Sequence, residues 1–186
     1  MWNNYITVES ADAAADKAAQ LGATVHAPPF DVMDVGRMAV IQDPQGAFFM
    51  VWEPKTNIGA GLVNQPGALA WNELASPDLD ASAKFYGDLF GWTTQSFEGS
   101  PTPYLIIMNG ERSNGGMREL GENDAGVPPH WLPYFGIDDI DRGLAKAREL
   151  GGTVLGGPID IGVAKIGIVQ DPQGAVFAIY DGEFQD

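Results

Sequence analysis

The sequence predicts an α+β fold built from tandem βαβββ modules, whose curved mixed sheets enclose a cavity. Three observations support this prediction. A segment near the N-terminus recurs near the C-terminus, a helix-start signal occurs three times, and short apolar runs follow each predicted helix. With 186 residues, the chain is long enough for one or two compact domains.

The repeat can be aligned residue by residue. Trp2 corresponds to Trp131 at an offset of 129 residues. Further along, the hexapeptide Gln42–Ala47 recurs unchanged as Gln170–Ala175, at an offset of 128 residues. One residue has therefore been gained or lost between these blocks, in a segment where a loop would tolerate the change. A third, more divergent copy lies between the two.

The helices of the three copies are predicted from their ends. Each begins after a short apolar strand, at a residue whose side chain suits an N-cap: Ser10, Asp78 and Asp139. An aspartate follows two positions later, in the positively polarised first turn. Each helix is expected to end at a glycine, because glycine readily takes the left-handed C-cap conformation: Gly22, Gly91, and Gly151 or Gly152.

Three strands are expected after each helix. In the first copy they cover 24–26, 37–42 and 47–53, and in the second copy 93–97, 104–108 and 113–120. The chain is therefore divided into a single module at 1–57 and a complete two-module domain at 66–186. The latter consists of modules 68–120 and 131–183, and we number the modules one to three in chain order.

Composition excludes several classes of function. The net charge of −15 repels phosphate backbones and anionic lipids, so we expect neither nucleic acid nor a membrane as partner. The chain has no cysteine, which rules out disulfides and thiolate chemistry. The first residues form neither a basic region nor a long apolar stretch. A cytoplasmic location is therefore expected.

Two motifs carry a resemblance to a known family. The stretch Phe85–Trp92 closes the second helix, and Asp-Pro-Gln-Gly precedes the last strand of modules one and three. With tandem βαβββ units, these motifs resemble the vicinal oxygen chelate superfamily of glyoxalase I, bleomycin-resistance proteins and extradiol dioxygenases. The resemblance implies that two modules pair edge to edge around a cavity. It also implies that metal ligands, where present, come from the first and last strands of each module.

The positions that would hold those ligands carry unsuitable side chains. The first-strand position falls at Trp71 in module two, Leu132 in module three and Asn3 in module one. The last-strand position falls at Ala178 in module three and at Met50 in module one. Trp, Leu, Ala and Met do not ligate hard or borderline divalent ions. We therefore predict no metal site and no cofactor; a divalent metal would mean that this alignment is wrong.

If the ligand position implied by the resemblance points inward, strand alternation then selects the residues that would line the cavity. Trp71 and Glu73 share one face of the first strand of module two. The predicted ligand-binding set is completed by four residues of module three: Leu132, Tyr134, Ala178 and Tyr180. A tryptophan beside a glutamate suits a cation, and Glu73 is also the candidate general base. In the competing interpretation, the aromatic side chains fill the interior and Glu73 reaches solvent at the rim.

An odd number of modules leaves one without a pairing partner. The sequence resembles a four-module protein that lacks its first module. We expect a homodimer, formed through the N-terminal module of each chain. As an alternative, module one packs on module two and leaves module three to find a partner.

Two functions from different classes follow from the resemblance. The first is a metal-free protein that binds a small organic molecule, cationic or aromatic, between paired modules. The second is an enzyme, a lyase, isomerase or dioxygenase with an unusual metal site or with Glu73 as base. A third interpretation, a purely structural module, predicts a cavity packed solid with side chains.

Overall fold

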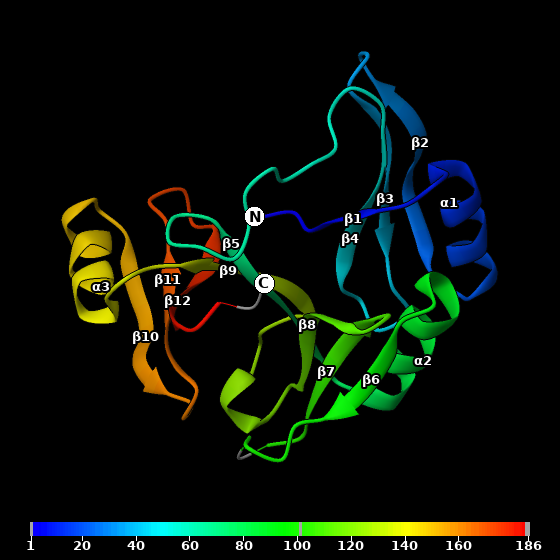
Figure 1. Cartoon of the computed structure of the whole chain (residues 1–186). Helices are drawn as coiled ribbons and strands as arrows, with labels where there is room; N and C mark the ends of the chain where they lie inside the picture. Colours follow the sequence, from blue (N-terminus) through cyan, green and yellow to red (C-terminus); the bar gives the residue numbers. More distant parts are fainter. Residues whose placement is uncertain (1, 101, 185–186) are drawn as a thin grey trace.

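The computed structural model describes residues 2–100 and 102–184 (Figure 1). Within these residues the chain forms three α-helices, one short 3-10 helix and twelve strands in two mixed sheets. The predicted α+β class and the threefold βαβββ order are confirmed. Both sheets are open, with β1 and β2 at the edges of one and β10 and β6 at the edges of the other. None of the described helices has the length and apolar character needed to cross a membrane.

Module one forms the four-stranded sheet, in the order β1-β4-β3-β2. Its first strand lies parallel to its last, with Tyr5 opposite Met50. The elements are β1 (Tyr5–Thr7), α1 (Ala11–Gln20), β2 (Thr24–Val32), β3 (Gly36–Gln42) and β4 (Phe48–Pro54).

Modules two and three share the eight-stranded sheet, in the order β10-β11-β12-β9-β5-β8-β7-β6. Their first strands, β5 and β9, pair antiparallel at its centre. Module two comprises β5 (Leu69–Ser76), α2 (Leu79–Phe90), β6 (Thr93–Ser96), β7 (Tyr104–Asn109) and β8 (Arg112–Glu119). The 3-10 helix η1 (Glu122–Asp124) leads to module three, with β9 (His130–Gly136), α3 (Ile140–Glu149), β10 (Thr153–Asp160), β11 (Ala164–Gln170) and β12 (Val176–Gly182).

The helix ends follow from local side-chain chemistry, as predicted. The side chains of Ser10, Asp78 and Asp139 each accept a hydrogen bond from the backbone three residues later. Such a bond satisfies one of the free N–H groups of the first turn. Gly91 ends α2 with a φ of 76°, a conformation that glycine adopts without steric cost.

The second strand of modules one and three is longer than the sequence indicated. β2 continues past His26 through Pro28 and Pro29 to Val32. The two prolines are tolerated because β2 is an edge strand that pairs only with β3, and two register shifts interrupt that pairing. β10, which contains one proline, Pro158, is likewise an edge strand, and two register shifts interrupt its pairing with β11.

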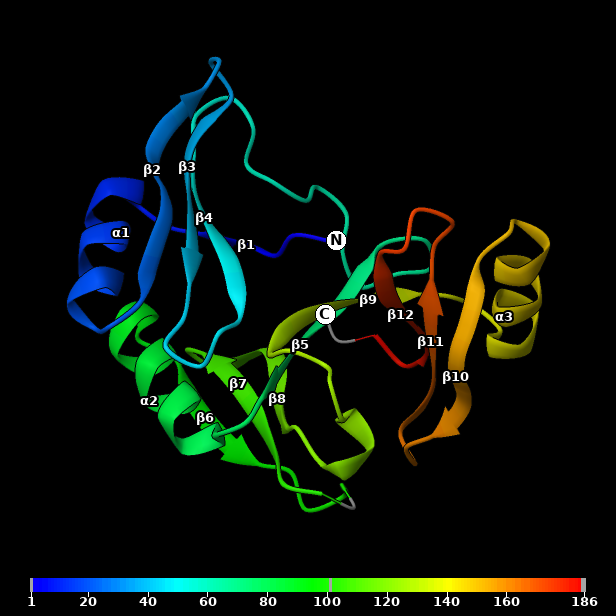
Figure 2. The same cartoon turned by 180° about the vertical axis from the view of Figure 1, so that it is seen from behind.

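Module one packs through its helix-bearing face on module two. Figures 1 and 2 show α1 and α2 at the same end of the molecule and α3 at the other end. Phe49 of β4 is fully buried against three aromatic side chains of α2. We call the shared cluster the interface core, and it contains Ala11, Ala15, Ala18, Ala39, Ile41, Ala47, Phe49, Val51, Leu74, Phe85, Tyr86, Leu89, Ile107, Met117 and Trp131.

A buried chain of hydrogen bonds links all three modules through this core. The indole N–H of Trp131 donates to the hydroxyl of Tyr86 at 2.9 Å, and that hydroxyl donates to Oδ2 of Asp43 at 2.8 Å. Oδ1 of Asp43 accepts three backbone N–H groups of its own turn, at 2.8 to 2.9 Å. Burial raises the pKa of Asp43, although these hydrogen bonds oppose the shift. The Asp-Pro-Gln-Gly turn of module one is therefore a structural contact between modules.

We expect Tyr86→Phe to lower the free energy of unfolding by about 1–3 kcal/mol, because it leaves Trp131 and Asp43 with buried unpaired groups. Urea-induced unfolding measures this loss. Tyr180→Phe is the matched control. It removes a hydroxyl whose partner among the described residues is the backbone oxygen of Glu183, and it should cost less than about 0.5 kcal/mol. Equal losses in the two variants would show that the buried chain contributes nothing specific.

Candidate functional site

The six residues predicted to bind a ligand lie together on one face of the eight-stranded sheet. β9 places Tyr134 opposite Trp71 and Leu132 opposite Glu73, and β12 places Ala178 opposite Tyr134. Helices α2 and α3 pack on the other face of this sheet, against residues such as Leu74 and Ile179. We call the face that carries the six residues the distal face: Trp71, Glu73, Leu132, Tyr134, Ala178 and Tyr180.

Glu73 is at the centre of the distal face and is held by neighbours from three strands. Only 8% of its surface is exposed. Its carboxylate accepts hydrogen bonds from the hydroxyls of Tyr134 and Tyr104. Nε of Arg118 lies 3.3 Å from its Oε1. The indole N–H of Trp71 donates to the Tyr104 hydroxyl at 3.0 Å, so Trp71 supports the same network.

Two members of this network, Tyr104 and Arg118, were not identified from the sequence, whereas Gly116 belongs to a glycine-containing stretch expected near the cavity mouth. The ring of Tyr104 crosses over Gly116, where a Cβ atom would lie 2.0 Å from the tyrosine hydroxyl. Gly116 is directly opposite Glu73 in the sheet. The paired glycines inside a strand were the available signal, because an interior glycine often marks a close approach.

Arg118 connects the distal face to the segment between modules two and three. It forms a bidentate pair with Asp124 of η1, with both N···O distances at 2.9 Å. One guanidinium is thus shared by two carboxylates, Glu73 and Asp124. The cluster consequently keeps an excess of negative charge when both carboxylates are ionised.

The rest of the distal face is apolar. Leu132, Tyr134 and Ala178 are buried together. The partly buried neighbours of this cluster are Trp71, Ile166, Ile168, Val176 and Tyr180. The face therefore combines one buried carboxylate with an aromatic and aliphatic surround, a combination found in pockets that orient small organic molecules.

Burial raises the pKa of Glu73 above its ordinary value, against the opposing charge of Arg118 and the hydrogen bonds from Tyr134 and Tyr104. Burial, followed by the charge of Glu73, also raises the pKa of Tyr104 and of Tyr134. Both hydroxyls therefore stay protonated and act as donors. The chemical capacity of the cluster is to accept or carry one proton at Glu73 and to attract positive charge.

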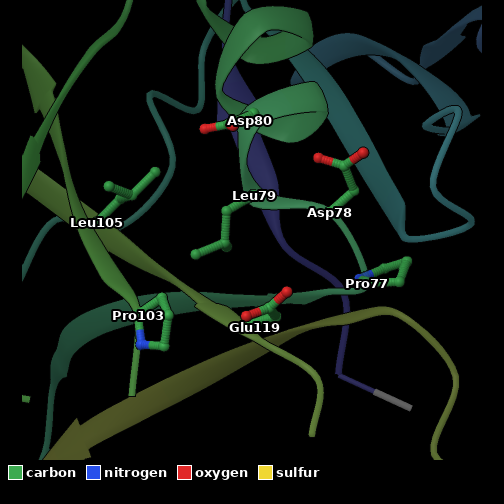
Figure 3. A pocket seen from close by; sticks show the side chains of 7 residues that line it. All are labelled: Pro77, Asp78, Leu79, Asp80, Pro103, Leu105 and Glu119. Atoms are coloured by element: carbon green, nitrogen blue, oxygen red, sulfur yellow. The ribbon is translucent and has the colours of Figure 1, made fainter. Parts of the chain in front are cut away.

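Two hollows lie outside the distal face, and none of the six predicted residues lines either of them. One, of about 470 Å³, is beside the start of α2, where Figure 3 shows Leu79 between the carboxylates of Asp80 and Glu119. The other, of about 710 Å³, runs along β1 between modules one and two.

The residues at the metal positions implied by the resemblance do not form a donor set. Trp71, Leu132 and Ala178 are at the distal-face positions implied by the resemblance, and none of them ligates a divalent ion. Among residues 2–100 and 102–184, no group of three or more His, Asp or Glu side chains could hold a metal. Glu73 already has an arginine and two tyrosines as partners.

Comparison with known proteins identifies relatives along the whole chain. The model of the Glyoxalase/Bleomycin resistance protein/Dioxygenase superfamily matches residues 68–179. A putative glyoxylase, CFP32, from Mycobacterium bovis is 41% identical over 181 residues, which cover 96% of this chain and 69% of the relative. The anthracycline biosynthesis protein DauV from Streptomyces sp. is 34% identical over 183 residues, covering 97% of this chain and 66% of the relative.

Solved structures share the fold at low sequence identity. The 2,3-dioxygenase LapB from Pseudomonas sp. KL28 superposes with a TM-score of 0.65 at 16% identity, covering 98% of this chain and 72% of LapB. The Mn(II)-bound glyoxalase from Novosphingobium aromaticivorans gives a TM-score of 0.66 at 17% identity, covering 97% and 64% of the two chains. These likenesses concern the fold alone.

Glu73→Gln should change how stability depends on pH. Because the folded-state pKa of Glu73 is raised, its contribution to stability is greatest below its unfolded pKa and falls as pH rises through the folded value. The difference in unfolding free energy, native protein minus variant, should therefore decrease from about pH 4 to about pH 8. Urea unfolding at several pH values measures it. The exposed Glu98→Gln serves as the control variant. A difference in unfolding free energy that grows with pH would contradict a raised pKa of Glu73.

Proposed function

Since the chain belongs to the glyoxalase/bleomycin-resistance protein/dioxygenase superfamily, we propose that it binds a small organic molecule on the distal face, without a resident metal ion. The observation that carries this proposal is the buried carboxylate of Glu73, held among aromatic and aliphatic side chains. Burying a carboxylate costs free energy, even when it is paired. Such a residue is therefore a candidate for contact with a ligand.

The chemistry of the distal face favours an aromatic or cationic ligand. Trp71, Tyr134 and Tyr180 offer aromatic surface, and the carboxylates of Glu73 and Asp124 outnumber the single guanidinium of Arg118. The protein's net charge of −15 favours positive charge as well. Two relatives are named for anthracycline biosynthesis, and anthracyclines are flat aromatic molecules.

The metal-free part of the proposal rests on the donor chemistry of the side chains. The positions that would supply ligands carry indole, aliphatic and methyl groups in place of imidazole and carboxylate. The absence of cysteine suits a reducing compartment, which supports the cytoplasmic location expected from the sequence.

A catalytic role is the second candidate, and the raised pKa of Glu73 is the observation that favours it. A carboxyl whose pKa is displaced upward can act as a general base or acid at a pH closer to neutrality. In this catalytic alternative, Glu73 would transfer a proton to or from the bound molecule. The hydroxyls of Tyr104 and Tyr134 would orient the carboxyl group of Glu73. The reaction class would be that of a lyase, an isomerase or an oxidoreductase of the superfamily.

We expect the protein to bind doxorubicin, an anthracycline with a protonated amine. Glu73→Gln should weaken that binding by about 10- to 150-fold, because a charged hydrogen bond contributes about 1.5–3 kcal/mol. The fluorescence anisotropy of doxorubicin measures the affinity. Glu98→Gln, which changes the net charge equally at an exposed site, should bind as the native protein does. Binding that does not saturate, or equal affinities for all three proteins, would contradict the proposal.

The metal-free property is tested separately. After incubation with Mn²⁺ and dialysis against salt, elemental analysis should find far less than one ion per chain, because the donor positions are apolar. A stoichiometric ion that is retained by the native protein and lost in Glu73→Gln would refute it.

A further inference from the structure

Building on the ligand binding proposed for the distal face, we infer that Asp124 of η1 sets the preference of this face for a cationic ligand. Asp124 acts through Arg118, whose guanidinium it keeps from pairing fully with Glu73. The carboxylate of Glu73 thereby retains an acceptor position for a positively charged donor of the ligand. Asp124 is thus a positioning residue for selectivity, and it lies outside the six residues of the distal face.

The guanidinium of Arg118 is committed mainly to Asp124. Its two terminal nitrogens donate to the two carboxylate oxygens of Asp124, each at 2.9 Å. One of them also donates to the backbone oxygen of Glu119 at 3.4 Å. Nε is the nitrogen left for Glu73, and it lies 3.3 Å from Oε1. Because a bidentate pair of arginine and carboxylate is stronger than a single contact, Arg118 serves Asp124 before Glu73.

The carboxylate of Glu73 has acceptor capacity to spare. An ionised carboxylate offers about four acceptor positions. Within residues 2–100 and 102–184, three donors meet that of Glu73: the hydroxyls of Tyr134 and Tyr104, and Nε of Arg118. An N–H group of a ligand would complete the set. Since Glu73 and Asp124 together outweigh the charge of Arg118, a protonated amine is favoured there over a neutral donor.

The local structure of η1 holds Asp124 in place. The N–H of Gly121 donates to Oδ2 of Asp124 at 2.9 Å, and the N–H of Asp124 donates to the carbonyl of Gly121 at 3.0 Å. Just before this turn, the N–H of Leu120 donates to the carbonyl of Ser76, at the end of β5, at 2.8 Å. The hydrogen bonds from Arg118 lower the pKa of Asp124, so its carboxyl is ionised at neutral pH. A fixed negative charge therefore faces Arg118.

The sheet register lets Arg118 turn from one carboxylate to the other. Gly116 is opposite Glu73 and Arg118 is opposite Ala75, two positions further along the same pair of strands. Because side chains two residues apart share a face, Arg118 and Glu73 rise side by side from the distal face. Without the charge of Asp124, the guanidinium fork would be free to pair with Glu73 through a second nitrogen. That pairing would fill the open acceptor position and leave the Arg118–Glu73 pair electrically neutral.

The test compares two ligands that share a ring system and differ in charge: doxorubicin and N-acetyldoxorubicin, in which acetylation removes the charge of the amine. Asp124→Asn should weaken the binding of doxorubicin about tenfold, because the ammonium loses its position at Glu73. The affinity for N-acetyldoxorubicin should change by less than about twofold, because no ligand charge is involved. Fluorescence anisotropy of the anthracycline ring system measures both affinities.

Two further variants separate this effect from a general loss of charge or structure. Glu122→Gln removes the same charge from an exposed residue of the same 3-10 helix, and it should bind both molecules as the native protein does. In a chain that already carries Glu73→Gln, adding Asp124→Asn should change the affinity for doxorubicin by less than about twofold. Asp124 acts through Glu73, so its effect should vanish with that carboxylate.

Equal weakening of both ligands by Asp124→Asn would overturn the inference, because it would show a loss of structure and not of selectivity. Unchanged binding of doxorubicin by this variant would also overturn it, while leaving the proposed ligand binding intact. If the native protein binds neither molecule saturably, the proposed function fails, together with the inference that rests on it.

Discussion

The arrangement of the three modules depends on the buried hydrogen bonds from Trp131 to Tyr86 and from Tyr86 to Asp43. They join the start of module three, the helix of module two and a turn of module one. All these groups lie within an aromatic core, where an unpaired polar atom would be costly. The requirement that each be satisfied leaves few ways to place module one against the eight-stranded sheet. The position of β1, at one edge of the four-stranded sheet, follows from that placement.

Much of the fold could be predicted because its signals are local. The capping side chains of Ser10, Asp78 and Asp139 act on backbone groups three residues away, and strand alternation decided which of Trp71 and Asn72 would share a face with Glu73. The internal repeat supplied the order of elements. The extended length of β2 could not be predicted, since prolines argue against a strand unless its outer edge is known to be free.

The candidate site was predictable only in part, for a related physical reason. Sequence alternation brought the six distal-face residues together, but the partners of Glu73 come from strands that are distant along the chain. Neither Tyr104 nor Arg118 is marked by a local motif, because their roles arise from the register of β7, β8 and β5. The two Asp-Pro-Gln-Gly turns illustrate the same limit: identical peptides make different contacts, since the tyrosine that distinguishes them belongs to another module.

The crossing of Tyr104 over Gly116 has a consequence for how this protein can evolve. Any side chain larger than hydrogen at position 116 would occupy the space of the tyrosine hydroxyl and expel it from the carboxylate. The two positions are thus coupled: the hydroxyl of Tyr104 keeps its place beside Glu73 only while residue 116 is glycine. Homologues with another residue at position 116 should therefore also lack the tyrosine at position 104. Covariation of the two positions would identify the homologues that keep the same carboxylate network.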